Sequence, residues 1–149
     1  MYRNSGMLPP KPELGLAKDL DKCYGCGPNN PFGLKLKFTW DGSAARAEFV
    51  PGEYHQGWPG LVHGGIIAAL LDEAMGYVTW FKGLECVTAK FEVRIRCTVP
   101  VGSHLVITGS LVNESRRLVT VRAIAAQSDG RVVAEGTGTM YVVNHTRRS

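Results

Sequence analysis

One long apolar segment in the middle of the chain constrains the fold more than any other feature. It runs from Ile66 to Phe81 and follows a glycine-rich stretch over residues 57–65. Apolar on nearly every side, it is typical of a buried helix. Two adjacent carboxylates, Asp72 and Glu73, nevertheless lie inside it. Because burying an unpaired charge is costly, an acid at such a place is expected to be either paired or functional.

The expected start of this helix offers a second chemical group. The N–H groups of Gly64 and Gly65 have no partner within the helix, so they can bind an anion or a polarised carbonyl. An N–H donor and an acid on one helix indicate acyl-transfer chemistry.

Eight residues separate Gly64 from Asp72, which is about 12 Å along a helix axis. A reacting carbonyl needs both groups within about 3–3.5 Å. The sequence therefore predicts a two-fold dimer in which each of two sites takes one group from each subunit.

The remaining patterns predict strands on both sides of the helix. Alternation over residues 34–40, the hairpin signal Asp41-Gly42 and a return over 45–49 indicate two strands. After Gly83, alternation continues over 89–96, 105–112, 118–126 and 132–143, which predicts four strands in a meander. A long antiparallel sheet with one apolar helix has one compact solution, an α+β fold in which the sheet curls around the helix.

Length and charge narrow the possible functions. The 149 residues predict a single domain, with an N-terminal arm over 1–22, where 14–20 favours one or two helical turns, and a polar tail over 144–149. The formal charge of +4 fits a small anionic ligand and is weak for a nucleic-acid-binding protein. No apolar run of membrane-spanning length is free of charge, and no secretory signal is evident, so we expect a cytoplasmic protein with no membrane partner.

The four cysteines leave more than one interpretation. Cys23 and Cys26 form a C-x-x-C pair, whereas Cys86 and Cys97 are isolated in strand-like segments. Zinc sites normally use paired groups of ligands, and no second pair is visible. A metal shared by two subunits is an alternative, and a redox pair lacks its usual βαβ context. Reduced cysteines in a packed turn are the favoured interpretation.

Four motifs together resemble the hotdog-fold thioesterases, in particular the branch of the phenylacetate-pathway acyl-CoA thioesterases. They are His63-Gly64-Gly65 with an acid nine residues after the histidine, the continuation LDEAMG over 71–76, and the segments CYGCGPNNPFGL (23–34) and QGWPG (56–60). The resemblance covers about residues 23–143. It implies a curved antiparallel sheet around one central helix, an acyl-CoA substrate, no metal or redox cofactor, and homodimers that commonly pair into tetramers.

The resemblance also assigns catalytic roles. Asp72 would act as the nucleophile or general base on the thioester, and the Gly64 N–H of the opposite subunit would polarise its carbonyl. Gln56 falls where the family places an Asn or Gln that orients the water or the carbonyl. Thr88 lies near a position where relatives carry a Ser or Thr that assists the water. Glu73 stays open as the rival acid, although a pocket-lining or structural role is favoured for it.

Further residues are candidates for substrate binding. They include Gly65 and His63, although a lone histidine at the start of a helix more often bonds backbone. Arg116 and Arg117, at an expected turn, are the first choice for contacts with the phosphates of coenzyme A. The helical neighbours of Asp72 are mostly small and leave room for a thin acyl chain; they are Ala68, Ala69, Met75 and Gly76.

Two other functions compete with the hydrolysis of a small or medium acyl-CoA. A non-catalytic module that binds acyl-CoA or an acyl carrier would not need a buried acid. A dehydratase would normally need a histidine on the helix near the acid, and none follows His63 there. The sequence does not define the acyl group: aromatic residues near the helix ends could line a pocket or belong to the core, namely Trp58, Tyr77, Trp80 and Phe81.

Overall fold

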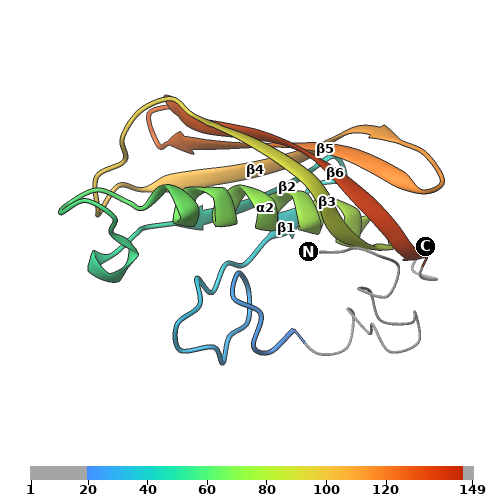
Figure 1. Cartoon of the computed structure of the whole chain (residues 1–149), viewed down its shortest axis with the longest axis horizontal. Helices are drawn as coiled ribbons and strands as arrows, with labels where there is room; N and C mark the ends of the chain where they lie inside the picture. Colours follow the sequence, from blue (N-terminus) through green and yellow to red (C-terminus); the bar gives the residue numbers. More distant parts are fainter. Residues whose placement is uncertain (1–19, 146–149) are drawn as a thin grey trace.

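A computed structural model describes residues 20–145 of the chain, in which a curved antiparallel sheet covers one long helix (Figure 1). The predicted order of two strands, one helix and four strands is confirmed. The elements are β1 (Thr39–Trp40), β2 (Ala44–Phe49), the 3₁₀ turn η2 (Glu53–His55), α2 (Gly64–Phe81), β3 (Leu84–Ile95), β4 (Leu105–Glu114), β5 (Leu118–Gln127) and β6 (Val132–His145). Most of the expected arm, including its helical turns over 14–20, lies outside the described residues. The strand β6 continues to His145, two residues into the expected tail.

The sheet has six strands in the order β1-β2-β4-β5-β6-β3. The predicted meander is correct for β4, β5 and β6 but wrong for β3, which pairs with β6 at one end of the sheet instead of with β4. This leaves β4 free to pair with β2, so the two strands that precede the helix join the same sheet as the four that follow it. Within residues 20–145, the outer edge of β3 pairs with no other strand.

The first predicted strand is shorter than its alternating pattern indicates. Only Thr39–Trp40 pairs with β2, and residues 34–38 are outside the sheet. The backbone N–H groups of Leu34 and Leu36 donate instead to the carbonyls of Tyr24 and Gly25, at 2.8 and 2.9 Å. The two leucines are still buried. The alternation therefore records one buried face correctly, but the hydrogen-bond partner is the 23–27 turn and not a strand.

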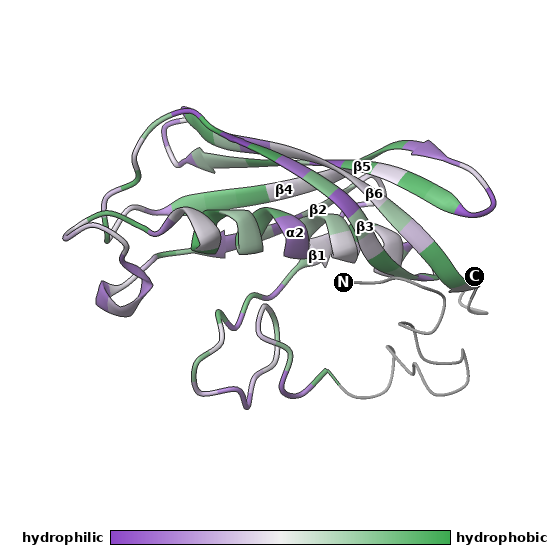
Figure 2. Ribbon diagram, in the orientation of Figure 1, coloured by the Kyte–Doolittle hydropathy of each residue, from purple (hydrophilic) through white to green (hydrophobic). Residues whose placement is uncertain are grey.

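The helix α2 presents two different faces. Its buried residues follow helical spacing, at 67, 70, 71, 74, 75, 78 and 79, and pack beneath the sheet. The helix and sheet pack tightly at Gly109 in β4, where a Cβ atom would lie 2.6 Å from the carbonyl oxygen of Ala74. The opposite face carries small residues and the two acids, which form the hydrophilic band in the middle of α2 (Figure 2). No helix within residues 20–145 is long and apolar enough to cross a membrane.

Candidate active site

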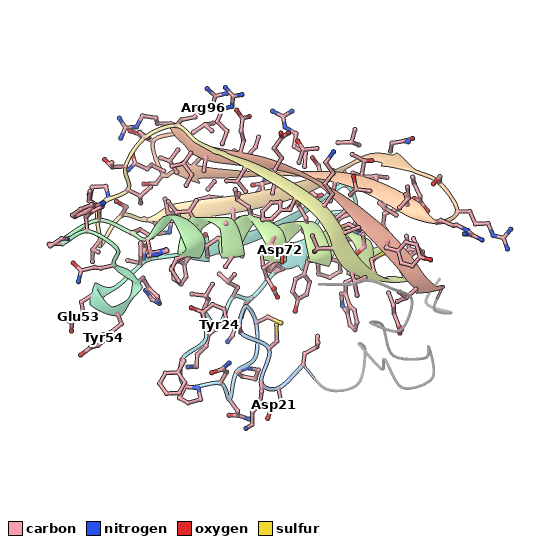
Figure 3. All side chains as sticks on the ribbon, in the orientation of Figure 1. Asp21, Tyr24, Glu53, Tyr54, Asp72 and Arg96 are labelled. Carbon is pink, nitrogen blue, oxygen red and sulfur yellow. The ribbon has the colours of Figure 1, made fainter. Side chains whose placement is uncertain are left out.

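Asp72 lies midway along α2, beside an open groove between the helix and β3 (Figure 3). The groove has a volume of about 620 Å³. Its floor along the helix is made of small residues, and its other wall comes from β3 and one side chain of β6. The lining residues are Gly65, Ala68, Ala69, Asp72, Glu73, Gly76, Cys86, Val87, Thr88, Phe91 and Met140. Three of the four expected neighbours of Asp72 line this groove, namely Ala68, Ala69 and Gly76, whereas Met75 belongs to the core and is fully buried.

The Asp72 carboxylate has one polar partner in this groove. The Thr88 hydroxyl donates a hydrogen bond to Asp72 Oδ1 at 2.8 Å. Burial raises the pKa of Asp72, and the Thr88 hydrogen bond lowers it in part. No Lys, Arg or His among residues 20–145 forms an ion pair with this carboxylate. An acid that is partly buried and has no counter-ion retains the basicity that a proton acceptor requires.

Glu73 faces a different environment, although it follows Asp72 directly. Its Oε2 lies 3.7 Å from Cys23 Sγ, and the 23–27 turn packs closely over its side chain. The pKa of Glu73 is raised to about 7: burial is the largest cause, the charge of Cys23 adds to it, and a hydrogen bond with the Cys26 side chain opposes both. A hydrogen bond with the Cys26 side chain, and others with the backbone N–H groups of Cys26 and Gly25, lower the pKa of Cys23.

The helix start lies in a second hollow. Gly64 lines it together with residues 57, 58, 62 and 63. His63 is the N-cap of α2, and its Nδ1 accepts a hydrogen bond from the Gly65 N–H at 2.8 Å. The Gly65 N–H is therefore occupied. No acceptor within residues 20–145 bonds the Gly64 N–H, and Gly64 is exposed. Of the two expected donors, only Gly64 is free to bind a ligand.

The other candidate residues lie apart from the Asp72 groove. Gln56 is exposed, and its side-chain amide forms two hydrogen bonds with the backbone of its own loop. Oε1 accepts from the Gly60 N–H, and Nε2 donates to the Glu53 carbonyl at 2.8 Å. Arg116 and Arg117 are exposed in the turn between β4 and β5. The structure thus brings Asp72, Glu73, Thr88 and Gly65 into one groove, with His63 and Gly64 in another and Gln56, Arg116 and Arg117 in neither.

The aromatic residues near the helix ends mostly serve packing. Tyr77 stacks on Phe38 with ring centroids 4.8 Å apart, and Phe81 stacks on Trp40 at 5.4 Å. Neither Tyr77 nor Phe81 lines the Asp72 groove. Trp58 is different, because it is 79% exposed beside Gly64.

Comparison with known proteins identifies the family. The family model "Thioesterase superfamily" matches residues 59–134, which includes all of α2. The acyl-coenzyme A thioesterase THEM4 of Bos taurus is 34% identical over 91 residues, which are 60% of this chain and 37% of that protein. THEM5 of Mus musculus, also named an acyl-coenzyme A thioesterase, is 31% identical over 85 residues, 57% of this chain and 34% of that protein. The chain therefore spans about a third of the length of the curated relatives it matches.

A solved structure supports the same fold. The PaaI protein from the phenylacetic acid degradation operon of E. coli superposes with a TM-score of 0.71 at 18% identity, covering 76% of this chain and 83% of that one. The expected sheet wrapped around a central helix is therefore confirmed. At this level of identity the likeness concerns the fold alone.

Proposed function

Because this chain belongs to the thioesterase superfamily, we propose that it hydrolyses the thioester of a small or medium acyl-coenzyme A. The observation that carries the proposal is the environment of Asp72: a carboxylate without a counter-ion among the described residues, hydrogen-bonded to Thr88, in an open groove of about 620 Å³. A non-catalytic binding module has no need of a partly buried acid at this place. The names of the curated relatives support the same substrate class.

In the proposed reaction, Asp72 accepts a proton from a water molecule as the water oxygen attacks the thioester carbonyl. The electron pair of the carbonyl moves to its oxygen, where a backbone N–H stabilises the negative charge. The tetrahedral intermediate then expels the coenzyme A thiolate, which takes up the proton held by Asp72, so the Asp72 carboxylate is regenerated. Direct attack by the carboxylate, through an anhydride that water then hydrolyses, gives the same products. Thr88 holds Asp72 Oδ1 in place in either route.

The N–H in question is that of Gly64 from a second subunit. Within one protomer Gly64 and Asp72 line separate hollows, and eight residues of helix between them correspond to about 12 Å. A dimer removes this separation if two α2 helices run in opposite directions side by side. The outer edge of the twelve-residue strand β3, unpaired within residues 20–145, offers a surface for such pairing.

The experiment is a thiol-release assay on purified protein with short, medium, long and aryl acyl-CoAs. We expect Asp72→Asn to fold normally and to lose turnover by about 10²- to 10⁴-fold, the usual contribution of a positioned base. Asp129→Asn, at an exposed carboxylate in the turn between β5 and β6, is the matched control and should retain activity. Full activity in folded Asp72→Asn would remove Asp72 from the mechanism. Tight binding of acyl-CoAs by the wild type without any hydrolysis would instead establish a binding protein.

A further inference from the structure

The cysteine pair near the N-terminal end of the described chain lies against the helix face that the sheet does not cover. Residues 20–38 form a loop below α2 (Figure 1). Two hydrogen bonds from Leu34 and Leu36 hold the 23–27 turn in this position. At Gly25 the contact is tight enough that a Cβ atom would lie 2.3 Å from Glu73 Oε1. The 23–27 turn therefore packs directly against the Glu73 carboxyl group.

This contact gathers three potential metal ligands. The Cys23 and Cys26 sulfurs and a Glu73 carboxylate oxygen all lie within 4.8 Å of one another. The distance from Cys23 Sγ to Glu73 Oε2 is 3.7 Å. In a tetrahedral zinc site, with Zn–S near 2.3 Å and Zn–O near 2.1 Å, the separation of a sulfur and an oxygen ligand is about 3.6 Å. The Cys23–Glu73 separation of 3.7 Å thus matches two ligands on one ion, and the Cys26 sulfur lies within 4.8 Å of both.

The charge of the three groups is compatible with a cation. Two thiolates and a carboxylate are anionic once deprotonated, and a bound divalent ion would compensate that charge. The ion pairs among residues 20–145 join other residues and do not include Glu73. Neither sulfur is in a disulfide.

We propose that Cys23, Cys26 and Glu73 bind a divalent, thiol-seeking cation of the zinc type, with water at a fourth position. Two thiolates and one carboxylate favour such an ion over the harder Mg²⁺ or Ca²⁺. Binding displaces the thiol protons to solvent, so affinity falls as pH is lowered. The ion fastens the 23–27 turn to α2 one residue from Asp72. The sequence favoured reduced cysteines because the third ligand comes from a helix 50 residues away.

The test measures metal binding without any substrate. Full-length protein, purified under reducing conditions and stripped with a chelator, is titrated with Co²⁺ and separately with Zn²⁺. We expect about one ion per protomer by elemental analysis, and a near-ultraviolet sulfur-to-cobalt charge-transfer band that Zn²⁺ abolishes. The double variant Cys23→Ser/Cys26→Ser should lose both the ion and the band. Glu73→Gln should keep a weaker site.

The matched control is Cys86→Ser/Cys97→Ser, which removes the two half-buried cysteines outside the cluster and should leave binding unchanged. Circular dichroism shows whether each variant is folded. The proposal is overturned if the folded wild type binds no stoichiometric metal. It is equally overturned if the Cys23→Ser/Cys26→Ser protein retains the band, or if Glu73→Gln binds as tightly as the wild type. None of these results depends on whether the protein hydrolyses acyl-CoA.

Discussion

Asp72 and Glu73 show how two neighbouring residues of the same type obtain different chemistry. One helical step rotates the side chain by about 100°. That rotation brings the Asp72 carboxylate to the Thr88 hydroxyl at 2.8 Å and Glu73 Oε2 to Cys23 Sγ at 3.7 Å. These surroundings favour Asp72 as the acid that acts on substrate, and they give Glu73 a role in the contact with the 23–27 turn.

Thr88 should set the pH at which Asp72 becomes active. Its hydrogen bond stabilises the charged carboxylate and lowers the pKa of Asp72, against the effect of burial. Thr88→Val removes the hydroxyl at similar volume, so the pKa of Asp72 rises and less of it is ionised at a given acidic pH. We expect the acidic limb of the kcat/KM profile to move to higher pH, with about tenfold lower activity on that limb for each pKa unit.

The matched control is Thr137→Val, an exposed threonine on β6 that lies outside the Asp72 groove. Its pH profile should match that of the wild type. A limb that stays in place in Thr88→Val, or moves to lower pH, would show that the ionisation of Asp72 does not control the rate.

For single residues, the sequence predicts which side chains share one helix far better than which side chains meet from distant parts of the chain. The unusual acids and the small residues around Asp72 follow directly from the 66–81 segment. The alignment of Thr88 with Asp72 needs the position of β3. The approach of Cys23 to Glu73 needs a loop whose path depends on backbone bonds from Leu34 and Leu36, and no periodicity specifies that path.

Among the elements, α2 and β4 pack closely together at Gly109. A Cβ atom at Gly109 would lie 2.6 Å from the backbone oxygen of Ala74 and 3.0 Å from Val78 Cγ2. A backbone oxygen within a helix cannot rotate away as a side chain can. The close packing of the helix on the sheet therefore requires a glycine at this position of β4.

We expect Gly109→Ala to lower the free energy of unfolding by about 1–3 kcal/mol, as overpacking of a core usually does. Urea-induced unfolding followed by circular dichroism measures the change. Gly52→Ala is the control with the same substitution, because a Cβ atom at Gly52 would lie 4.0 Å from the nearest atom, His55 Nδ1, and the φ of −108° suits alanine. If the two variants are equally stable, the helix and sheet are less tightly packed than the distances indicate.

The errors in the predicted elements have a common cause. Alternation over 34–40 correctly marks Leu34 and Leu36 as buried, and alternation after Gly83 correctly marks four strands. Alternation reports which side of a segment is covered, but not which neighbour pairs with it. The pairing of β3 with β6, and of residues 34–36 with the 23–27 turn, depends on contacts between distant parts of the chain.

For the whole molecule, the proposed shared site can be tested by mixing two inactive variants. Gly64 is the first residue of α2, where proline is well tolerated, and its predecessor His63 has φ −63° and ψ 136°, which suit a residue before proline. Gly64→Pro therefore removes the N–H with little effect on the helix. It should lower turnover by about 10²- to 10³-fold.

Co-expression of Gly64→Pro with Asp72→Asn should restore activity if each site combines two subunits. About half of the dimers are then mixed, and each mixed dimer has one site with both groups intact, so about a quarter of wild-type activity is expected. Size-exclusion chromatography checks that both variants dimerise. A mixture no more active than its parents would place both groups of a site in the same subunit.

Because Gly64 and Asp72 are separated in one protomer, specific activity should also depend on the protein concentration. If neither hollow is competent alone, working sites appear only as chains associate, and their number grows with the square of the chain concentration in dilute solution. Specific activity should then decline on dilution. A thioester that contacts both chains should counteract this decline by holding the dimer together. When the enzyme is dilute, its specific activity should therefore rise more steeply with substrate concentration.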